Sequence, residues 1–122
     1  MTYMAHGDPL EGHFNELRRG TVVLACLWLL TTPGYGYALL TELARHGFDT
    51  DANTLYPLLR RLEQQGYLTS DWNTDEARPR KFYRTTDAGA RAAAALQSEW
   101  RALTGALDTL PRAARTPEPE QA

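Results

Sequence analysis

The chain has 122 residues, 43% of them hydrophobic and 23% charged, a composition typical of one globular domain. Its formal net charge of −2 excludes nucleic-acid binding that depends on overall charge alone. The single cysteine, Cys26, excludes a disulfide framework within the chain and favours a cytoplasmic location. No apolar run approaches the roughly 20 residues of a membrane span, so no membrane function is expected.

Helical signals begin after an N-terminal segment that has no hydrophobic period. Residues 1–9 are predicted to form a flexible arm. Apolar residues then recur on two adjoining faces over residues 10–30, which predicts a helix that needs partners on two sides. A Thr-Thr-Pro-Gly segment at residues 31–34 would end this helix, and a shorter helix is expected over residues 35–46.

The third predicted helix has an apolar side and a polar side. Asp51 is a suitable N-cap, and Gly66 would end the helix. By helical periodicity, the apolar side, which we expect in the core, comprises Leu55, Leu58, Leu59 and Leu62. The opposite side comprises Asn53, Pro57, Arg60 and Gln64, flanked by Thr54, Tyr56 and Arg61.

Aromatic and β-branched residues after Gly66 predict two short strands, at about residues 67–72 and 80–85, joined by a loop. Basic charge is concentrated here, because four cations and no acidic residue fall within seven positions: Arg78, Arg80, Lys81 and Arg84. A cationic hairpin tip can reach DNA phosphates or an adjacent minor groove.

Thr86 would cap a last helix that reaches about Leu110. This helix carries a seam at steps of four and three: Gly89, Ala93, Leu96, Trp100, Leu103, Leu107 and Leu110. Such a seam is typical of a coiled coil, although it could also pack against its own domain. We favour a second copy as partner, because a three-helix core with a hairpin has little room for a helix about 35 Å long. The tail, residues 111–122, is predicted to be disordered.

The order of these elements predicts a mainly helical α+β fold, a winged helix-turn-helix with a two-stranded wing. Residues 10–86 would form a DNA-binding domain and residues 87–110 a dimerisation helix. In this arrangement the third helix is free to enter a major groove. Amides on its polar side can pair with adenine, arginines with guanine, and Thr54 and Tyr56 with phosphates. The alternative for the arginines is a solvated helix face, but the basic hairpin that follows favours DNA.

Two stretches resemble the signature of PadR-type transcriptional regulators: TLYPLLRRLEQQG at residues 54–66 and RPRKFYRTTDAG at residues 78–89. The resemblance covers roughly residues 16–110. It implies a winged-helix homodimer built on the first and last helices, usually a repressor at an inverted-repeat operator. The residues that we expect to contact double-stranded DNA are Tyr37, Asn53, Thr54, Tyr56, Pro57, Arg60, Arg61, Gln64, Arg78, Arg80 and Lys81.

The single C-terminal helix is similar to that of a short subgroup that includes multidrug-responsive regulators. There a tryptophan on the last helix faces a pore at the dimer interface and stacks on planar ligands, and Trp100 occupies the matching place. Plain interface packing is the alternative for this residue. The resemblance implies a planar aromatic or cationic effector, with Trp28 and Phe14 as further liners. The expected dimer interface comprises Leu17, Thr21, Leu24, Ala93, Leu96, Trp100, Leu103, Leu107 and Leu110.

One position departs from the family pattern, because Tyr35 stands where many members have a histidine. Any role of that histidine therefore does not transfer to this chain. An enzyme, a metal site and a cofactor are not expected, since the three histidines are scattered and no metal-binding or phosphate-loop spacing occurs. A winged-helix module that binds a protein in place of DNA is the alternative function.

Overall fold

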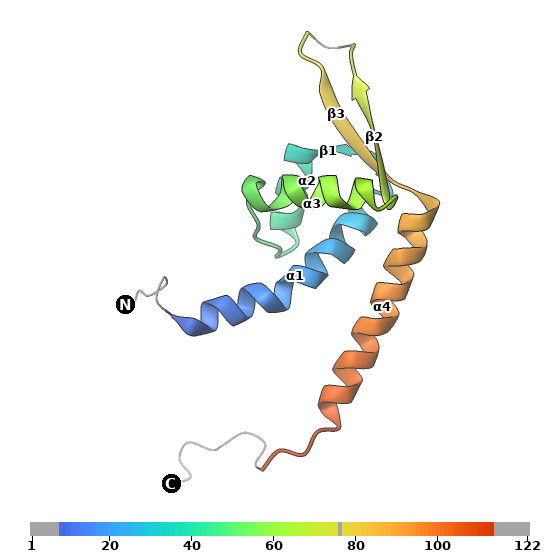
Figure 1. Cartoon of the computed structure of the whole chain (residues 1–122). Helices are drawn as coiled ribbons and strands as arrows, with labels where there is room; N and C mark the ends of the chain where they lie inside the picture. The colour runs from blue at the N-terminus through green and yellow to red at the C-terminus, as the bar shows by residue number, and fades with distance from the viewer. Residues whose placement is uncertain (1–7, 76, 114–122) are drawn as a thin grey trace.

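The computed structural model describes residues 8–75 and 77–113. The elements in chain order are α1 (Pro9–Leu29), β1 (Gly34–Tyr35), α2 (Gly36–Arg45), α3 (Ala52–Gln64), β2 (Leu68–Asn73), β3 (Arg80–Thr85) and α4 (Asp87–Asp108). Figure 1 shows α2 and α3 beside the small sheet, with the β2–β3 hairpin, the wing, extending to one side and α1 and α4 to the other. Most of the predicted arm and tail lies outside the described residues.

The mainly helical winged-helix fold is confirmed, but its sheet has one strand more than the sequence predicts. All three strands are antiparallel, in the order β1-β3-β2. Strand β1 has only two residues and places Tyr35 opposite Phe82. A strand of this length leaves no alternating pattern in the sequence. Because β1 leads directly into α2, the middle of β3 is attached to the start of that helix.

The ends of α3 and α4 are fixed by side-chain caps at the residues that the sequence predicts. A carboxylate oxygen of Asp51 accepts the Thr54 amide at 2.9 Å, and the Thr86 hydroxyl accepts the Gly89 amide at 3.0 Å. At the other end of α3, Gly66 has a positive φ of 82°, which a residue with a side chain rarely adopts. The chain therefore turns sharply from α3 into the wing.

Leucines dominate a core that is shared by α1, α2, α3 and α4. The apolar side of α3 is buried as predicted, with Leu55 and Leu59 fully enclosed. Cys26 is also fully buried, and this burial raises the pKa of its thiol to about 12. The other members of the core are Leu24, Leu27, Leu30, Leu39, Leu43, Leu58, Leu62, Leu68, Tyr83 and Ala93.

The start of α4 is bonded to the end of α3 and to α1 through two consecutive threonines, the Thr85–Thr86 junction. Thr86 donates its amide to the Tyr67 carbonyl at 3.0 Å and its hydroxyl to the Gly66 carbonyl at 2.6 Å. The Thr85 amide donates to the Leu30 carbonyl at 2.8 Å. Three helices and the wing therefore meet at one hydrogen-bonded point.

Gly89 lets the first turn of α4 approach this junction. A Cβ at this position would overlap the carbonyl oxygen of Tyr67 and lie 2.8 Å from a methyl carbon of Thr85. We predict that Gly89→Ala lowers the free energy of unfolding by about 1–3 kcal/mol, because a backbone carbonyl cannot move aside cheaply. Urea denaturation followed by circular dichroism measures this change.

Gly105→Ala is the matched control on the same helix, since nothing lies within 4 Å of a Cβ there. It is expected to be neutral or to stabilise by up to about 1 kcal/mol, because alanine favours helix more than glycine does. Equal stability of the two variants would contradict the close packing at Gly89.

Candidate nucleic-acid interface

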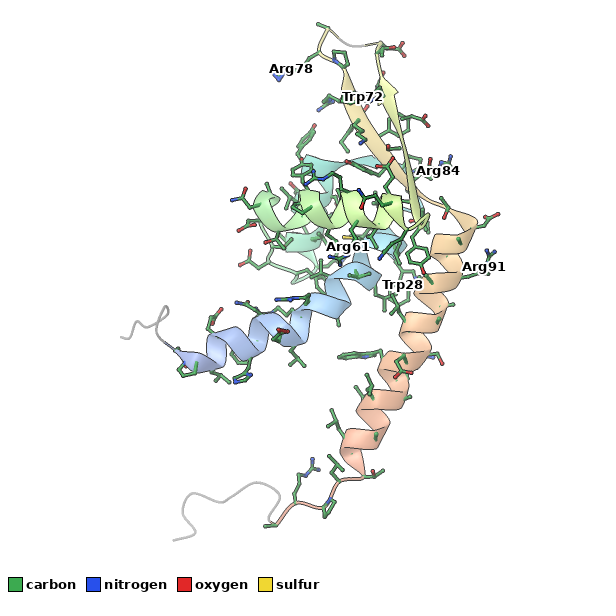
Figure 2. All side chains as sticks on the ribbon, viewed as in Figure 1. Trp28, Arg61, Trp72, Arg78, Arg84 and Arg91 are labelled. Atoms are coloured by element: carbon green, nitrogen blue, oxygen red, sulfur yellow. The ribbon has the colours of Figure 1, made fainter. Side chains whose placement is uncertain are left out.

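The outer side of α3 forms an exposed polar surface, the reading face, comprising Asn53, Pro57, Arg60 and Gln64. One edge of this helix faces the wing, because Glu63 bonds to a side chain of β2. The other edge faces α1, and Figure 2 shows Arg61 between the two helices. The reading face therefore lies between two neighbouring elements that could each border a DNA groove.

Tyr56 separates the reading face from the start of α2. Its ring packs so closely on Gly36 that a Cβ at residue 36 would overlap the ring, with the hydroxyl oxygen 2.8 Å away. Tyr56 is half-buried as a result. The expected DNA contact from this residue is thus limited to the part of its side chain that remains exposed.

Glu63 connects α3 to both long strands of the wing. Its carboxylate accepts the Ser70 hydroxyl at 2.6 Å and lies 3.5 Å from the Lys81 ammonium. Lys81 also lies over the ring of Tyr83, at 5.5 Å from the centroid. Burial raises the pKa of Tyr83, and the Lys81 charge opposes this shift, so the phenol remains neutral near pH 7.

Arg80 occupies an aromatic cluster at the loop end of the wing strands, where it pairs with Asn73. Its guanidinium carbon lies 4.3 Å from the centroid of Tyr35 and 5.1 Å from that of Tyr37. One guanidinium nitrogen donates to the Tyr37 hydroxyl at 2.8 Å. The Asn73 amide donates to the Tyr35 hydroxyl at 2.7 Å. We call these four residues the Arg80 cluster; it joins both strands of the wing to β1 and α2.

The cations that the sequence analysis selected therefore fall into two groups. Arg60, Arg61 and Arg78 are exposed, and Figure 2 shows Arg78 at the tip of the wing. Arg80 and Lys81 are half-buried and held in contacts within the chain. Periodicity and charge counting could not distinguish these groups, since the partners of Arg80 and Lys81 come from distant parts of the sequence.

A cleft of about 630 Å³ lies between α1, the segment before α3 and α3 itself. Three arginines line it: Arg18, Arg19 and Arg61. Asp49 and Asp51 lie at the same cleft, and the second of these caps α3. The two α1 arginines are not among the residues predicted to contact DNA, although two adjacent cations on one helix are visible in the sequence.

Most of the predicted dimer residues are apolar and exposed in the single chain. Leu17 on α1 and Leu103 on α4 are more than half exposed, at 67% and 53%. Leu96, Trp100 and Leu107 continue this exposed surface along α4, and Leu110 lies just beyond its end. Leu24 and Ala93 instead belong to the core, at 8% and 2% exposure, and have little surface left for a partner. The seam residues in the first turns of α4 therefore pack within the chain, and the seam residues further along are exposed.

The three aromatic residues expected at an effector site are partly exposed: Trp100, Trp28 and Phe14. Figure 2 shows Trp28 where α1 and α4 approach each other. Phe14 is 14 residues earlier on α1, about 21 Å along the helix axis, and its ring lies under Arg18. One chain therefore does not bring Phe14 and Trp28 together.

None of the helices within residues 8–75 and 77–113 has the length and hydrophobicity of a membrane span. Within the same residues, no group of histidine, cysteine or acidic side chains is arranged to hold a metal ion.

A helix-turn-helix with an exposed polar face on its second helix, followed by a hairpin that carries the exposed Arg78 near its tip, defines a winged-helix DNA-binding protein. The family model for the transcriptional regulator PadR-like family matches residues 23–95. The chain belongs to this family. Because its members are transcriptional regulators, the prediction that the chain is not an enzyme is confirmed.

Individual relatives agree with this assignment. The crystal structure of a PadR family transcriptional regulator from Eggerthella lenta is 46% identical, has a TM-score of 0.83, and covers 92% of this chain and 100% of its own. A transcriptional regulator from Clostridium thermocellum is 26% identical, with a TM-score of 0.72 and coverage of 80% and 99%. Transcriptional regulator Rv3488 of Mycobacterium tuberculosis is 45% identical over 69 residues, which span 57% of this chain and 62% of that protein.

Proposed function

We propose that the chain is a homodimeric, ligand-responsive repressor whose two copies of α3 bind the two halves of an inverted-repeat operator. The observation that carries this proposal is the reading face, which is exposed and polar and lies opposite four buried leucines. In this proposal residues 10–86 form the DNA-binding unit and residues 87–110 the dimerisation helix. The alternative is a winged-helix module that binds another protein.

Base recognition is assigned to the reading face and phosphate binding to the surfaces beside it. Asn53 and Gln64 carry amides that match the adenine edge, and Arg60 carries the planar fork that matches guanine. Arg78 is the exposed wing cation that is placed to meet phosphates or a minor groove. Arg61 and the neighbouring cleft arginines would provide positive charge on the opposite edge of α3.

DNA binding can be tested with the DNA upstream of the chain's own coding sequence, titrated at several salt concentrations. We predict that Arg78→Ala weakens binding to all sequences and lowers the salt slope by about one. Arg60→Ala should cost about 1–3 kcal/mol and relax the preference at particular base pairs. Fluorescence anisotropy with single-base operator variants measures both effects.

The matched control for charge removal is Arg91→Ala, because this exposed arginine lies on α4 and extends away from the wing and α3 (Figure 2). Its DNA affinity and salt slope should equal those of the unmodified chain. If the unmodified chain shows no salt-dependent preference for any DNA, the protein-binding alternative replaces the proposed function.

Dimerisation is supported by the uncovered apolar surface of α4 and of the first half of α1. Four apolar side chains of α4, together with Leu110 just beyond its end, are at least 40% exposed, which is costly for a surface helix in water. A second copy offers the same surface, so a two-fold contact would cover both. Such a dimer could place its two α3 helices about 34–36 Å apart, the distance between successive major grooves on one side of DNA.

We predict that Leu103→Asp converts the dimer to a monomer, because a carboxylate would be buried in the apolar interface. Sedimentation velocity or light scattering measures the mass. Ala102→Asp is the control, since this exposed residue is the immediate neighbour of Leu103 but lies off the seam. A dimeric Leu103→Asp variant, or a monomeric Ala102→Asp variant, would contradict the proposed interface.

Effector binding is assigned to Trp100, whose indole is 44% exposed on the same surface. A planar cation could stack on this ring within the dimer interface. We predict that ethidium, used as a planar aromatic cation, quenches the tryptophan fluorescence of the DNA-free protein and that Trp100→Phe removes the quenching. Trp72→Phe is the control, because Trp72 is also exposed but lies on the wing. Quenching that persists in Trp100→Phe excludes this site.

A further inference from the structure

We propose that Arg80 is a positioning residue and that the Tyr37 hydroxyl, which Arg80 orients, is the group that binds a DNA phosphate at the start of α2. This proposal rests on the proposed function, since it concerns how the same interface holds the DNA backbone. Charge alone suggests that Arg80 contacts a phosphate directly, whereas here Arg80 orients Tyr37. Tyr35 contributes to the same group of contacts.

The hydrogen bond between Arg80 and Tyr37 has a direction that leaves one proton available. Arg80 donates to the Tyr37 oxygen at 2.8 Å, so this oxygen is an acceptor, and the phenolic hydrogen is left to be donated elsewhere. Tyr37 is 54% exposed, so this hydrogen can point to solvent or to DNA. A phosphate oxygen is a suitable acceptor, and a neighbouring guanidinium strengthens the donor by polarising it.

The position of Tyr37 fits a backbone contact. It is the second residue of α2 (Gly36–Arg45), which precedes α3 in the helix-turn-helix. In this motif the first helix crosses the DNA backbone while the second enters the major groove. The partial positive charge at the start of a helix also favours an anion there. Tyr37 can therefore contact a phosphate while the reading face contacts bases.

The planar guanidinium of Arg80 both stacks on aromatic rings and donates a hydrogen bond. It lies over the rings of Tyr35 and Tyr37 at 4.3 and 5.1 Å, and those rings are themselves stacked with centroids 6.4 Å apart. A flat, weakly hydrated guanidinium can stack on aromatic rings and donate in its plane at the same time, which an ammonium cannot do. The arrangement therefore depends on the shape of the cation more than on its charge.

Tyr35 attaches the same cluster to both long strands of the wing. Its hydroxyl accepts from Asn73 at the end of β2, and its ring meets Phe82 of β3 edge-on at 6.0 Å. The angle of the wing and the position of the Tyr37 hydroxyl are consequently set by one group of contacts. In this chain, the tyrosine at the position where the family often has histidine serves to build this group.

The test compares variants that keep the charge with variants that remove it, by fluorescence anisotropy on the same upstream DNA at several salt concentrations. If Arg80 positions Tyr37, Arg80→Lys should weaken binding roughly tenfold, as much as Arg80→Ala does, with the salt slope of Arg80→Lys unchanged. Arg78→Lys is the matched control on the wing and should bind like the unmodified chain, because a lysine there still meets phosphates.

Tyr37→Phe removes one oxygen and keeps the ring, so it tests the phosphate donor even where an Arg80 variant fails to fold. It should also lose roughly tenfold in affinity without a change in salt slope. The double variant Arg80→Lys with Tyr37→Phe should bind no more weakly than Tyr37→Phe alone, since Arg80 acts through Tyr37.

Two results overturn the proposal while leaving DNA binding itself intact. One is an Arg80→Lys variant that binds as well as the unmodified chain, which identifies Arg80 as an ordinary phosphate contact. The other is a Tyr37→Phe variant with unchanged affinity. Absence of DNA binding by the unmodified chain overturns this proposal together with the proposed function.

Discussion

The burial of the leucine side of α3 is the constraint on which the rest of the structure depends. Leu55, Leu59 and Leu62 are at most 2% exposed, and each buried leucine contributes about 1.5–3 kcal/mol. A typical net hydrogen bond contributes only about 0.5–1.5 kcal/mol. Apolar packing therefore decides the rotation of α3 about its axis. Because the helix is rigid, the same packing turns Asn53, Arg60 and Gln64 outward.

Polar contacts then fix how the neighbouring elements lie against α3. Glu63 binds both long strands of the wing, and the Arg80 cluster binds the wing to β1 and α2. Two of the participants, Arg80 and Lys81, are residues that a charge count would assign to DNA. The surface that the proposed function assigns to phosphates is smaller than the number of basic residues suggests, and it lies mainly at the wing tip and beside Arg61.

The sequence predicted the features that depend on nearest neighbours along the chain. The caps at Asp51 and Thr86 and the leucine side of α3 follow local rules that hold in any context, and all are present. Strand β1 was missed because two residues carry no period. Leu24 and Ala93 were predicted to lie in the dimer interface but are buried within the chain. Hydrophobic periodicity identifies the apolar face of a helix but not the element that packs against it.

Sequence patterns could not predict the contacts between residues that are far apart in the chain. Arg80 and Tyr37 are 43 positions apart, and no spacing rule relates them. The cleft arginines Arg18 and Arg19 come together with Arg61 only after α1 packs beneath α3. The sequence could thus assign the candidate site to one helix and one hairpin, while the fold was needed to show which of its residues are held in contacts within the chain.

The Thr85–Thr86 junction couples the geometry of α4 to that of α3. Helix α4 has 22 residues and is about 33 Å long. A sideways shift of about 3 Å at its far end would rotate a rigid α4 by about 5°. Over the roughly 34 Å between half-sites, the same rotation moves a recognition helix by about 3 Å, close to the rise of one base pair. In the proposed dimer, small changes in how the two α4 helices cross would therefore change how well both recognition helices fit one operator.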